Sequence, residues 1–400
     1  DGTHNVAVGY QSLDAADSGE SQNVAIGSYA GGAINDSSSD NNVLIGHYAG
    51  QGGAANMNSC VAVGSQAMDG TGTISSADNV AIGLSALGGS WAGGASNKNI
   101  AIGSYAMDAA MNGSYSNIAI GYDALGALTH GDANIAIGAY FDGTYKAAMN
   151  DNVTGSYCIA IGSGALQEAN EDDNDGSVAI GYGACNLQAG TGGAQFASAT
   201  TAVGYKALTA LTTGAGNTAV GYQAGNILTT GGTNTIIGHD ADVDANDRAG
   251  CIVIGSGLSL NTASDNVVEI GNNTNSMTYD LDGGDITVTS DVRTKKNIKD
   301  TKLGLEFINK LRPITYQTKS PSQYPKEFGI ENPSKKSSGK TWDGLIAQEV
   351  KEVMDEMDVG FSGWEEGINT KQRLAYGKFV MPLIKAVQEL TAKVEALEAK

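Results

Sequence analysis

Residues 23–27 read Asn-Val-Ala-Ile-Gly, and close variants of this pentapeptide return throughout the first two thirds of the chain. Related segments stand at residues 5–9, 42–46, 117–121 and 217–221. The fifteen glycines that end the copies are residues 9, 27, 46, 64, 83, 103, 121, 138, 162, 181, 204, 221, 238, 255 and 271. Their mean spacing of about 19 residues is typical of a protein built from stacked structural repeats.

The order of residue types within the motif predicts a short β-strand. Val and Ile alternate with Ala and Gly, which is the two-residue period of a half-buried strand. β-Branched residues suit a pleated sheet, and a glycine after the strand permits the positive φ or close chain approach of a tight corner. The Gly-, Ser-, Asn- and Asp-rich stretches between copies vary in length, as loops do. We therefore expect a β-solenoid in which stacked neighbouring coils bury the aliphatic face.

Two other residue types recur with the coils. We interpret the Asn that opens the motif as a stacked ladder or turn-former, and the Tyr that often follows the glycine as packing between coils or chains; glycan stacking is the alternative for Tyr. Cysteine replaces this Asn in three copies, which indicates packing rather than a disulfide framework. The tyrosines are Tyr10, Tyr29, Tyr48, Tyr105, Tyr122, Tyr182, Tyr205 and Tyr222, and the cysteines are Cys60, Cys158, Cys185 and Cys251.

A metal or cofactor site is not expected. The four histidines are scattered and show no metal-ligand spacing. Asp240, Asp242 and Asp244 alternate as at the start of an EF-hand loop, but Ala245 stands where that loop needs Gly and Cys251 where it needs Glu. The three aspartates are therefore only a weak calcium candidate.

Charge divides the chain near residue 290. Residues 1–290 contain 27 acidic and four basic residues, whereas residues 291–400 contain 16 acidic and 19 basic ones. Nucleic acids and anionic membranes need cationic partners, so the acidic part argues against both. No stretch of the sequence approaches the roughly 18 apolar residues of a membrane-spanning helix. Because the sequence starts at Asp1 rather than Met, we expect it to be a fragment of a longer protein.

The repeats, Asn-[Val/Ile]-Ala-[Ile/Val]-Gly-x-x-Ala, resemble the head repeat of trimeric autotransporter adhesins. The resemblance covers roughly residues 1–271, although the copies are spaced more widely here. It implies a left-handed parallel β-roll that assembles as a trimer.

The sequence beyond the repeats resembles a second family. Residues 290–298 read Ser-Asp-Val-Arg-Thr-Lys-Lys-Asn-Ile, residues 304–316 run from Gly-Leu-Glu-Phe-Ile to Arg-Pro-Ile-Thr-Tyr, and residues 344–350 read Gly-Leu-Ile-Ala-Gln-Glu-Val. Leu-Ala-Tyr follows at 374–376 and leads into residues 383–390. In this order the segments resemble the endosialidase-type intramolecular chaperone domain found at the C-termini of phage tail fibres, tailspikes and endosialidases. The resemblance covers residues 290–400 and implies a domain that trimerises, templates folding of the preceding β-fibre and then cuts itself off.

The resemblance implies cleavage between Ser290 and Asp291. Residues 291–400 contain no histidine, which leaves Ser290 and Lys295 as a serine–lysine pair. A lysine serves as general base only if desolvation or neighbouring cations lower its pKa, and Arg293 is one such neighbour. Arg293 and Asn297 are the expected supporting residues. A solvated basic turn without catalysis is the alternative.

Two neighbouring peptide bonds are candidates for the cleavage, one on each side of Ser290. Attack of the Ser290 hydroxyl on its own carbonyl closes a strained four-membered ring, whereas attack on the Thr289 carbonyl passes through a five-membered ring. Attack from a neighbouring protomer is a third route. We place the cut at Ser290–Asp291 because the family resemblance does.

The final segment predicts an amphipathic helix. Its apolar residues alternate spacings of three and four, with Val at heptad position a and Leu at d, which is typical of a parallel coiled coil. A coiled coil of this length is not stable alone. We therefore expect it to help the chaperone trimerise. Binding of an unrelated partner is the alternative. The residues are Val380, Leu383, Val387, Leu390, Val394 and Leu397.

Together these patterns predict a mainly β protein: a trimeric β-roll shaft over residues 1–271, a connector over 272–290, a small α+β chaperone domain over 291–378 and a coiled-coil helix over 379–400. We expect a homotrimeric phage tail fibre that is made in the host cytoplasm, belongs to the virion and binds a host cell-surface receptor, a glycan or an outer-surface protein. Single-turnover autoproteolysis is the only catalysis expected. A polysaccharide-depolymerising tailspike and a cell-surface trimeric adhesin with the same chaperone are the alternatives.

Overall fold

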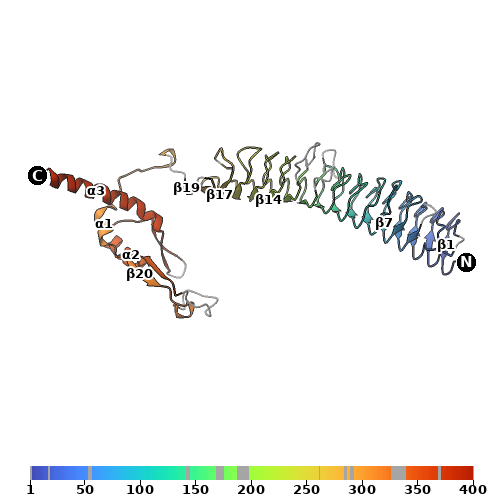
Figure 1. The fold of residues 1–400 in the computed structure, drawn as a ribbon, viewed down its shortest axis with the longest axis horizontal. Coiled ribbons are helices and arrows are strands. Elements are labelled where there is room, and N and C mark those ends of the chain that lie inside the picture. The colour runs from blue at the N-terminus through green and yellow to red at the C-terminus, as the bar shows by residue number, and fades with distance from the viewer. Residues whose placement is uncertain are drawn as a thin grey trace. The chain divides into compact units, whose positions relative to one another are not determined.

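The computed structural model describes residues 2–16, 19–52, 56–140, 145–167, 175–186, 198–260, 262–282, 286–288, 292–325, 339–367 and 371–399. The chain forms two compact units, Asp1–Ser290 and Asp291–Lys400. The described part of the first unit contains β-strands and turns, and that of the second combines short strands with helices (Figure 1).

The first unit is a parallel β-solenoid whose coils stack along one 17-stranded sheet. Neighbouring coils pair at equivalent motif positions; Ala101 lies opposite Ala119, for example. The parallel strands are β1 (Val6–Val8), β2 (Val24–Ile26), β3 (Val43–Ile45), β5 (Val61–Val63), β7 (Val80–Ile82), β8 (Ile100–Ile102), β9 (Ile118–Ile120), β10 (Ile135–Ile137), β11 (Ile159–Ile161), β12 (Val178–Ile180), β13 (Thr201–Val203), β14 (Thr218–Val220), β15 (Thr235–Ile237), β16 (Ile252–Ser256) and β17 (Val267–Asn272).

The sheet changes character at its C-terminal end. Strands β18 (Ser276–Asp280) and β19 (Ile286–Val288) continue it with antiparallel pairing. A separate short parallel pair, β4 (Met57–Asn58) and β6 (Ser76–Ala77), lies in the loops of two neighbouring coils. Parallel pairing of equivalent positions in successive coils is the arrangement that the repeat predicted.

The motif glycine forms the corner that follows each strand. Gly103 has a φ of 137°, in the region that favours glycine, and a Cβ atom there would lie 2.3 Å from the carbonyl oxygen of Gly121 in the next coil. Gly27 has the same φ and the same distance to the oxygen of Gly46. Both the backbone conformation and the approach of neighbouring coils therefore require glycine.

From β2 on, the middle residue of each three-residue strand of the parallel sheet points into the solenoid. Ala25, Leu44 and Ala101 are 0% exposed, and so are the Ala and Leu or Met side chains that follow the corner, such as Ala106 and Met107. The interior thus combines alanine at the strand with larger side chains, mostly Leu and Met, beyond the corner.

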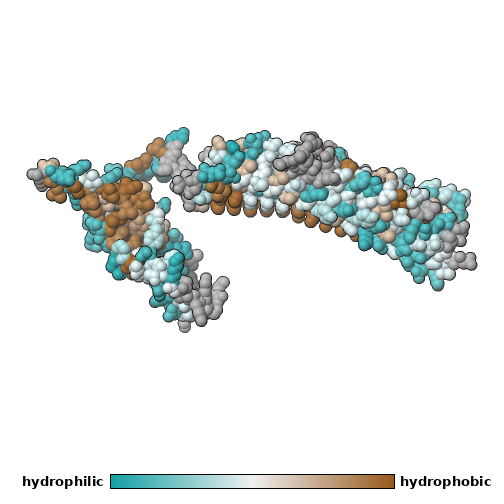
Figure 2. Space-filling view, viewed as in Figure 1, coloured by the Kyte–Doolittle hydropathy of each residue, from teal (hydrophilic) through white to brown (hydrophobic). Residues whose placement is uncertain are grey.

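The Val and Ile side chains of the motif point the other way, so the expectation that stacking buries them is wrong. Ile26, Ile102 and Ile180 are 36–39% exposed. Figure 2 shows apolar residues in a row along the edge of the shaft where Figure 1 draws the strands. Because side chains alternate between the two faces of a strand, burying the central Ala places its neighbours outside. We call this row the aliphatic ridge; its exposed members include Val8, Ile26, Ile45, Ile82, Ile102, Ile161, Ile180, Val220, Ile237, Ile254 and Ile270.

The second unit is a small α+β domain. In its described residues the helices are α1 (Leu305–Lys310), α2 (Ala347–Glu356) and α3 (Val380–Glu398), and two pairs of strands are antiparallel, β20 (Ile314–Gln317) with β21 (Thr341–Gly344) and β22 (Trp364–Glu366) with β23 (Gln372–Leu374). Short 3₁₀ turns lie at η2 (Val292–Thr294), η3 (Pro321–Gln323) and η6 (Tyr376–Phe379). The core consists of Phe307, Val350, Met354, Phe361 and Phe379.

Candidate self-cleavage site and assembly surfaces

The predicted cleavage pair is Ser290, the last residue of the first unit, and Lys295, which belongs to the second unit. Ser290 and Asp291 lie outside the described residues. Lys295 directly follows the 3₁₀ turn η2, and its backbone N–H donates to the carbonyl oxygen of Val292 at 3.0 Å. Lys295 belongs to the second unit and follows Ser290 by five residues in the sequence.

The side chains around this turn are exposed in the single chain. Arg293, Lys295 and Asn297 are all exposed to solvent. Asn297 has a φ of 57°, a left-handed conformation that Asn tolerates better than most residues, so its visible role is to turn the chain. A lysine base needs a desolvated setting, and the described residues of one chain leave the Lys295 side chain exposed.

The motif asparagines form the predicted ladder. Asn134 donates its backbone N–H to Oδ1 of Asn117 at 3.0 Å, and Asn117 does the same to Asn99 at 2.9 Å. The Asn134 side-chain amide donates to the carbonyl oxygen of Gly155 at 2.7 Å. These asparagines are 0% exposed, so each one supplies partners to backbone groups that water does not reach.

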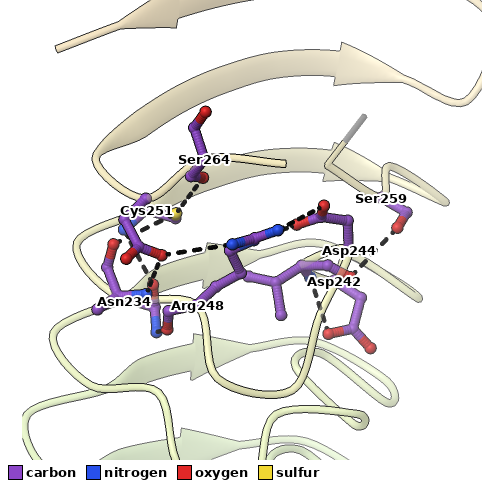
Figure 3. Close-up of polar contacts among 10 residues, drawn as sticks. Asn234, Asp242, Asp244, Arg248, Cys251, Ser259 and Ser264 are labelled. Carbon is purple, nitrogen blue, oxygen red and sulfur yellow. Dashed lines mark hydrogen bonds and ion pairs between the residues drawn. The ribbon is translucent and has the colours of Figure 1, made fainter. Parts of the chain in front are cut away.

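The cysteines are buried and packed. Cys60, Cys158 and Cys251 each donate a backbone N–H to the Asn of the preceding coil, at 2.9–3.0 Å; Figure 3 shows Cys251 beside Asn234. Burial raises the pKa of the Cys158 thiol to about 11 and that of Cys185 to about 12. The thiolate is the reactive form of cysteine, so these thiols are inert packing groups.

The tyrosines stack from coil to coil. Ring centroids lie 5.5 Å apart for Tyr182 and Tyr205, 5.1 Å apart for Tyr205 and Tyr222, and 4.9 Å apart for Tyr222 and His239, with interplanar angles of 7–12°. Packing between coils is thus confirmed for this run. Within the run, the ring faces that would stack against a sugar are covered by neighbouring rings.

The three aspartates that the sequence offers as a calcium site, Asp240, Asp242 and Asp244, contact protein groups instead. Asp244 pairs with Arg248, whose Nε lies 2.6 Å from Oδ1, and Asp240 pairs with His239 at 3.1 Å. Asp242 accepts the backbone N–H groups of Val243 and Ile227 at 2.9 and 3.2 Å. Figure 3 shows Asp242 near the pair of Asp244 and Arg248. In the described ranges no group of three or more His, Cys, Asp or Glu side chains is placed to hold a metal ion.

Helix α3 carries an exposed apolar row. Leu383, Val387 and Leu390 are 46–61% exposed, and Leu397 is 70% exposed. An apolar groove of about 450 Å³ adjoins the start of this row, with Leu383 in its wall. The groove is also lined by Ile308, Leu311, Pro313, Asp343, Gly344, Leu345, Tyr376 and Phe379. Among the helices of the described segments, none is long and apolar enough to cross a lipid bilayer.

Sequence reasoning missed the outward direction of the aliphatic ridge. The signal was present: the residue between Val and Ile is Ala in most copies, and a large apolar interior would not select the smallest apolar side chain there. Reasoning from sequence also missed a contact between α1 and α3, made by Leu305 and Glu389, because it joins residues 84 positions apart.

Comparison with known proteins identifies one segment. Residues 290–358 match the family model described as chaperone of endosialidase. The match begins at the predicted cleavage serine and includes α1, β20, β21 and α2. No curated protein and no solved structure matches the chain. The chain thus combines a β-solenoid shaft with a segment of the endosialidase-chaperone type.

Proposed function

We propose that this chain is the distal part of a homotrimeric fibre whose C-terminal domain drives assembly and then cleaves itself from the shaft. The observation that carries the proposal is the aliphatic ridge, a row of exposed Val and Ile side chains along a chain of net charge −20. Other copies of the chain are the occupants that fit it, because each copy offers the same surface at the same coil spacing.

The aliphatic ridge can hold chains together only through the summed contribution of its coils. Burying the remaining exposed part of one Ile side chain is worth about 0.5–1 kcal/mol. Summed over the coils of one chain this becomes about 5–10 kcal/mol, which is enough to hold chains together once they are aligned. Single coils contribute too little to select the correct alignment.

Alignment is therefore the step that needs a chaperone. Slipping one chain by one coil places near-identical motifs opposite each other, so the repeats themselves specify register weakly. Pairing between separate chains is also non-local and slow, and exposed strand edges favour aggregation meanwhile. A domain that joins three chains at one end fixes the register before the shaft winds.

The proposed cleavage is a single hydrolysis. The neutral amine of Lys295 takes the Ser290 hydroxyl proton as the oxygen adds to the Ser290 carbonyl carbon of a neighbouring protomer, a route that avoids the four-membered ring of attack within one chain. The C–N bond to Asp291 then breaks, and the leaving nitrogen receives that proton. One water hydrolyses the resulting ester and restores the hydroxyl. Because Lys295 is exposed in a single chain, we expect the desolvated setting to be completed only in the assembled trimer.

The biological setting that we propose is a phage virion. The fibre would be made in the host cytoplasm, become part of the virion tail and bind a host surface receptor, a glycan or an outer-surface protein, through its loops. The chaperone-type segment and the β-solenoid support a fibre or tailspike of this kind. An acidic shaft would keep such a rod soluble.

Charge placed on the ridge tests the assembly. The double variant Ile102→Asp with Ile180→Asp should lose the trimer in light scattering after size exclusion, because pairs of carboxylates would be buried between chains. Ile102→Val with Ile180→Val, which keeps the surface apolar, should remain trimeric. A monomeric, monodisperse wild-type chain would contradict the proposal.

Mass spectrometry tests the cleavage. The wild-type chain should give pieces of about 290 and 110 residues. Ser290→Ala and Lys295→Arg should stay intact, whereas Lys302→Ala, which removes an exposed cation seven residues further along the chain, should still be cut. The fragment masses also distinguish a cut before Ser290 from one after it. An intact wild-type chain would rule out self-cleavage.

A further inference from the structure

Helix α1 is capped by a distant residue. The first N–H groups of a helix have no partner inside the helix, and Gly304 has no side chain to offer. Leu305 instead donates its backbone N–H to Oε2 of Glu389 on α3, at 2.8 Å. A carboxylate at this end also meets the positive end of the helix dipole.

Gly304 leaves space for this contact. A Cβ atom at position 304 would lie 2.5 Å from Oε2 and 2.6 Å from Oε1 of Glu389, closer than real Cβ contacts allow. A side chain at this position would therefore displace the carboxylate from the N–H of Leu305.

Glu389 stands where α3 leaves the domain. Ala386, one turn earlier, is 5% exposed. Glu389 is half-buried and has Lys385 at 3.9 Å, whereas every described residue from 391 to 399 is exposed. This exposed half carries Val394 and Leu397, the end of the apolar row that other copies would cover.

After the short 3₁₀ turn at residues 292–294, helix α1 is the next regular element along the chain. Residues 295–304 form neither helix nor strand. Phe307 of α1 is 0% exposed and its ring lies 5.3 Å from that of Phe361 in the core. The position of α1 therefore sets the downstream end of the segment that carries Lys295.

We propose that Glu389 is a positioning residue that couples assembly of the C-terminal helices to self-cleavage. The inference rests on the proposed function. Packing of three α3 helices steadies the helix at the point where Glu389 projects, and its carboxylate then holds the start of α1 and the Lys295 segment in place. Glu389 touches none of the reacting atoms. Cleavage thereby follows alignment of the chains instead of preceding it.

A time course of cell-free synthesis tests the coupling, with the full chain analysed for trimer content and for cleavage separately. Glu389→Ala should still give trimers but cleave about tenfold to a hundredfold more slowly, as misplacement of a reacting segment does. Glu389→Gln keeps an oxygen that accepts the Leu305 N–H and should cleave within about threefold of wild type. Glu395→Ala, an exposed glutamate on the free half of α3, is the matched control and should cleave normally.

Trimeric Glu389→Ala that cleaves at the wild-type rate overturns the coupling, and so does a Gln variant as slow as Ala. If Glu389→Ala does not assemble, Gly304→Ala decides in the same assay, since it displaces the carboxylate without changing α3. Loss of the trimer in both variants also overturns it, because the contact then serves assembly itself. If the wild-type chain itself stays intact, the proposed self-cleavage is wrong. The wild-type sample alone shows this, so the result is distinguishable from a failure of the coupling.

Discussion

A buried carboxylate interrupts the apolar interior near the C-terminal end of the shaft. Asp242 is 9% exposed and stands four residues after a motif glycine, where earlier coils place buried residues such as Leu125 and Leu208. Its two oxygens accept backbone N–H groups from Val243 and Ile227. Desolvation nevertheless dominates and raises the pKa of Asp242 to about 6. The hydrogen bond to Ile227 links two coils, but the ionised carboxylate at neutral pH is poorly solvated and therefore destabilising.

The stability of the shaft should therefore depend on the ionisation of Asp242. A raised pKa means that its stabilising contribution is fully present below about pH 4 and is lost as pH rises through about 6. Relative to Asp242→Asn, which does not titrate, the wild-type free energy of unfolding should fall by about 2–3 kcal/mol between pH 4 and pH 7. Thermal unfolding of both proteins across this range measures the difference. Parallel pH profiles would show that Asp242 is not the group responsible.

Strands and corners of the shaft were predictable because they depend on local rules. The Val-Ala-Ile alternation and the following glycine act within five residues, and the structure has strands and corners where they predict them. Which face turns inward depends on the width of the whole coil, and there the prediction was wrong. At the candidate site, Ser290 and Lys295 stay a prediction from motif and chemistry. Glu389 escaped prediction because no local pattern links it to Leu305.

The amphipathic pattern of α3 predicts a second test of assembly, separate from the ridge. Val387 and Leu390 are 61% and 50% exposed, on the row proposed to face other copies. Val387→Asp with Leu390→Asp should prevent trimer formation at micromolar concentration and leave the chain uncleaved, because buried like charges oppose association. Light scattering and gel analysis of the same sample report both effects.

Gln388→Asp is the matched control for this variant. It adds a charge at an exposed position between the two, outside the apolar row. The control should assemble and cleave as wild type does. Trimers of unchanged stability in the double variant would show that α3 takes no part in assembly.

The two units differ in what they can do alone. The shaft has an interior of alanine, leucine and methionine, a repeated surface that specifies register weakly, and an apolar ridge that a single chain leaves exposed. The second unit has its own aromatic core and an exposed helical row. On the proposed function, the information for alignment lies in the second unit and the stability lies in the assembled shaft. Cutting between them separates the two tasks in time.

This division predicts that cleavage makes folding irreversible. The uncleaved Ser290→Ala trimer, unfolded in guanidinium and diluted, should recover trimers because each chain keeps its aligning domain. The cleaved wild-type shaft, freed of the second unit, should unfold more slowly but fail to recover and aggregate instead, since nothing fixes its register a second time. Light scattering after dilution, with unfolding rates from circular dichroism, separates the two behaviours. Equal recovery of both proteins would mean that the shaft aligns its own chains, and the second unit would then need a different explanation.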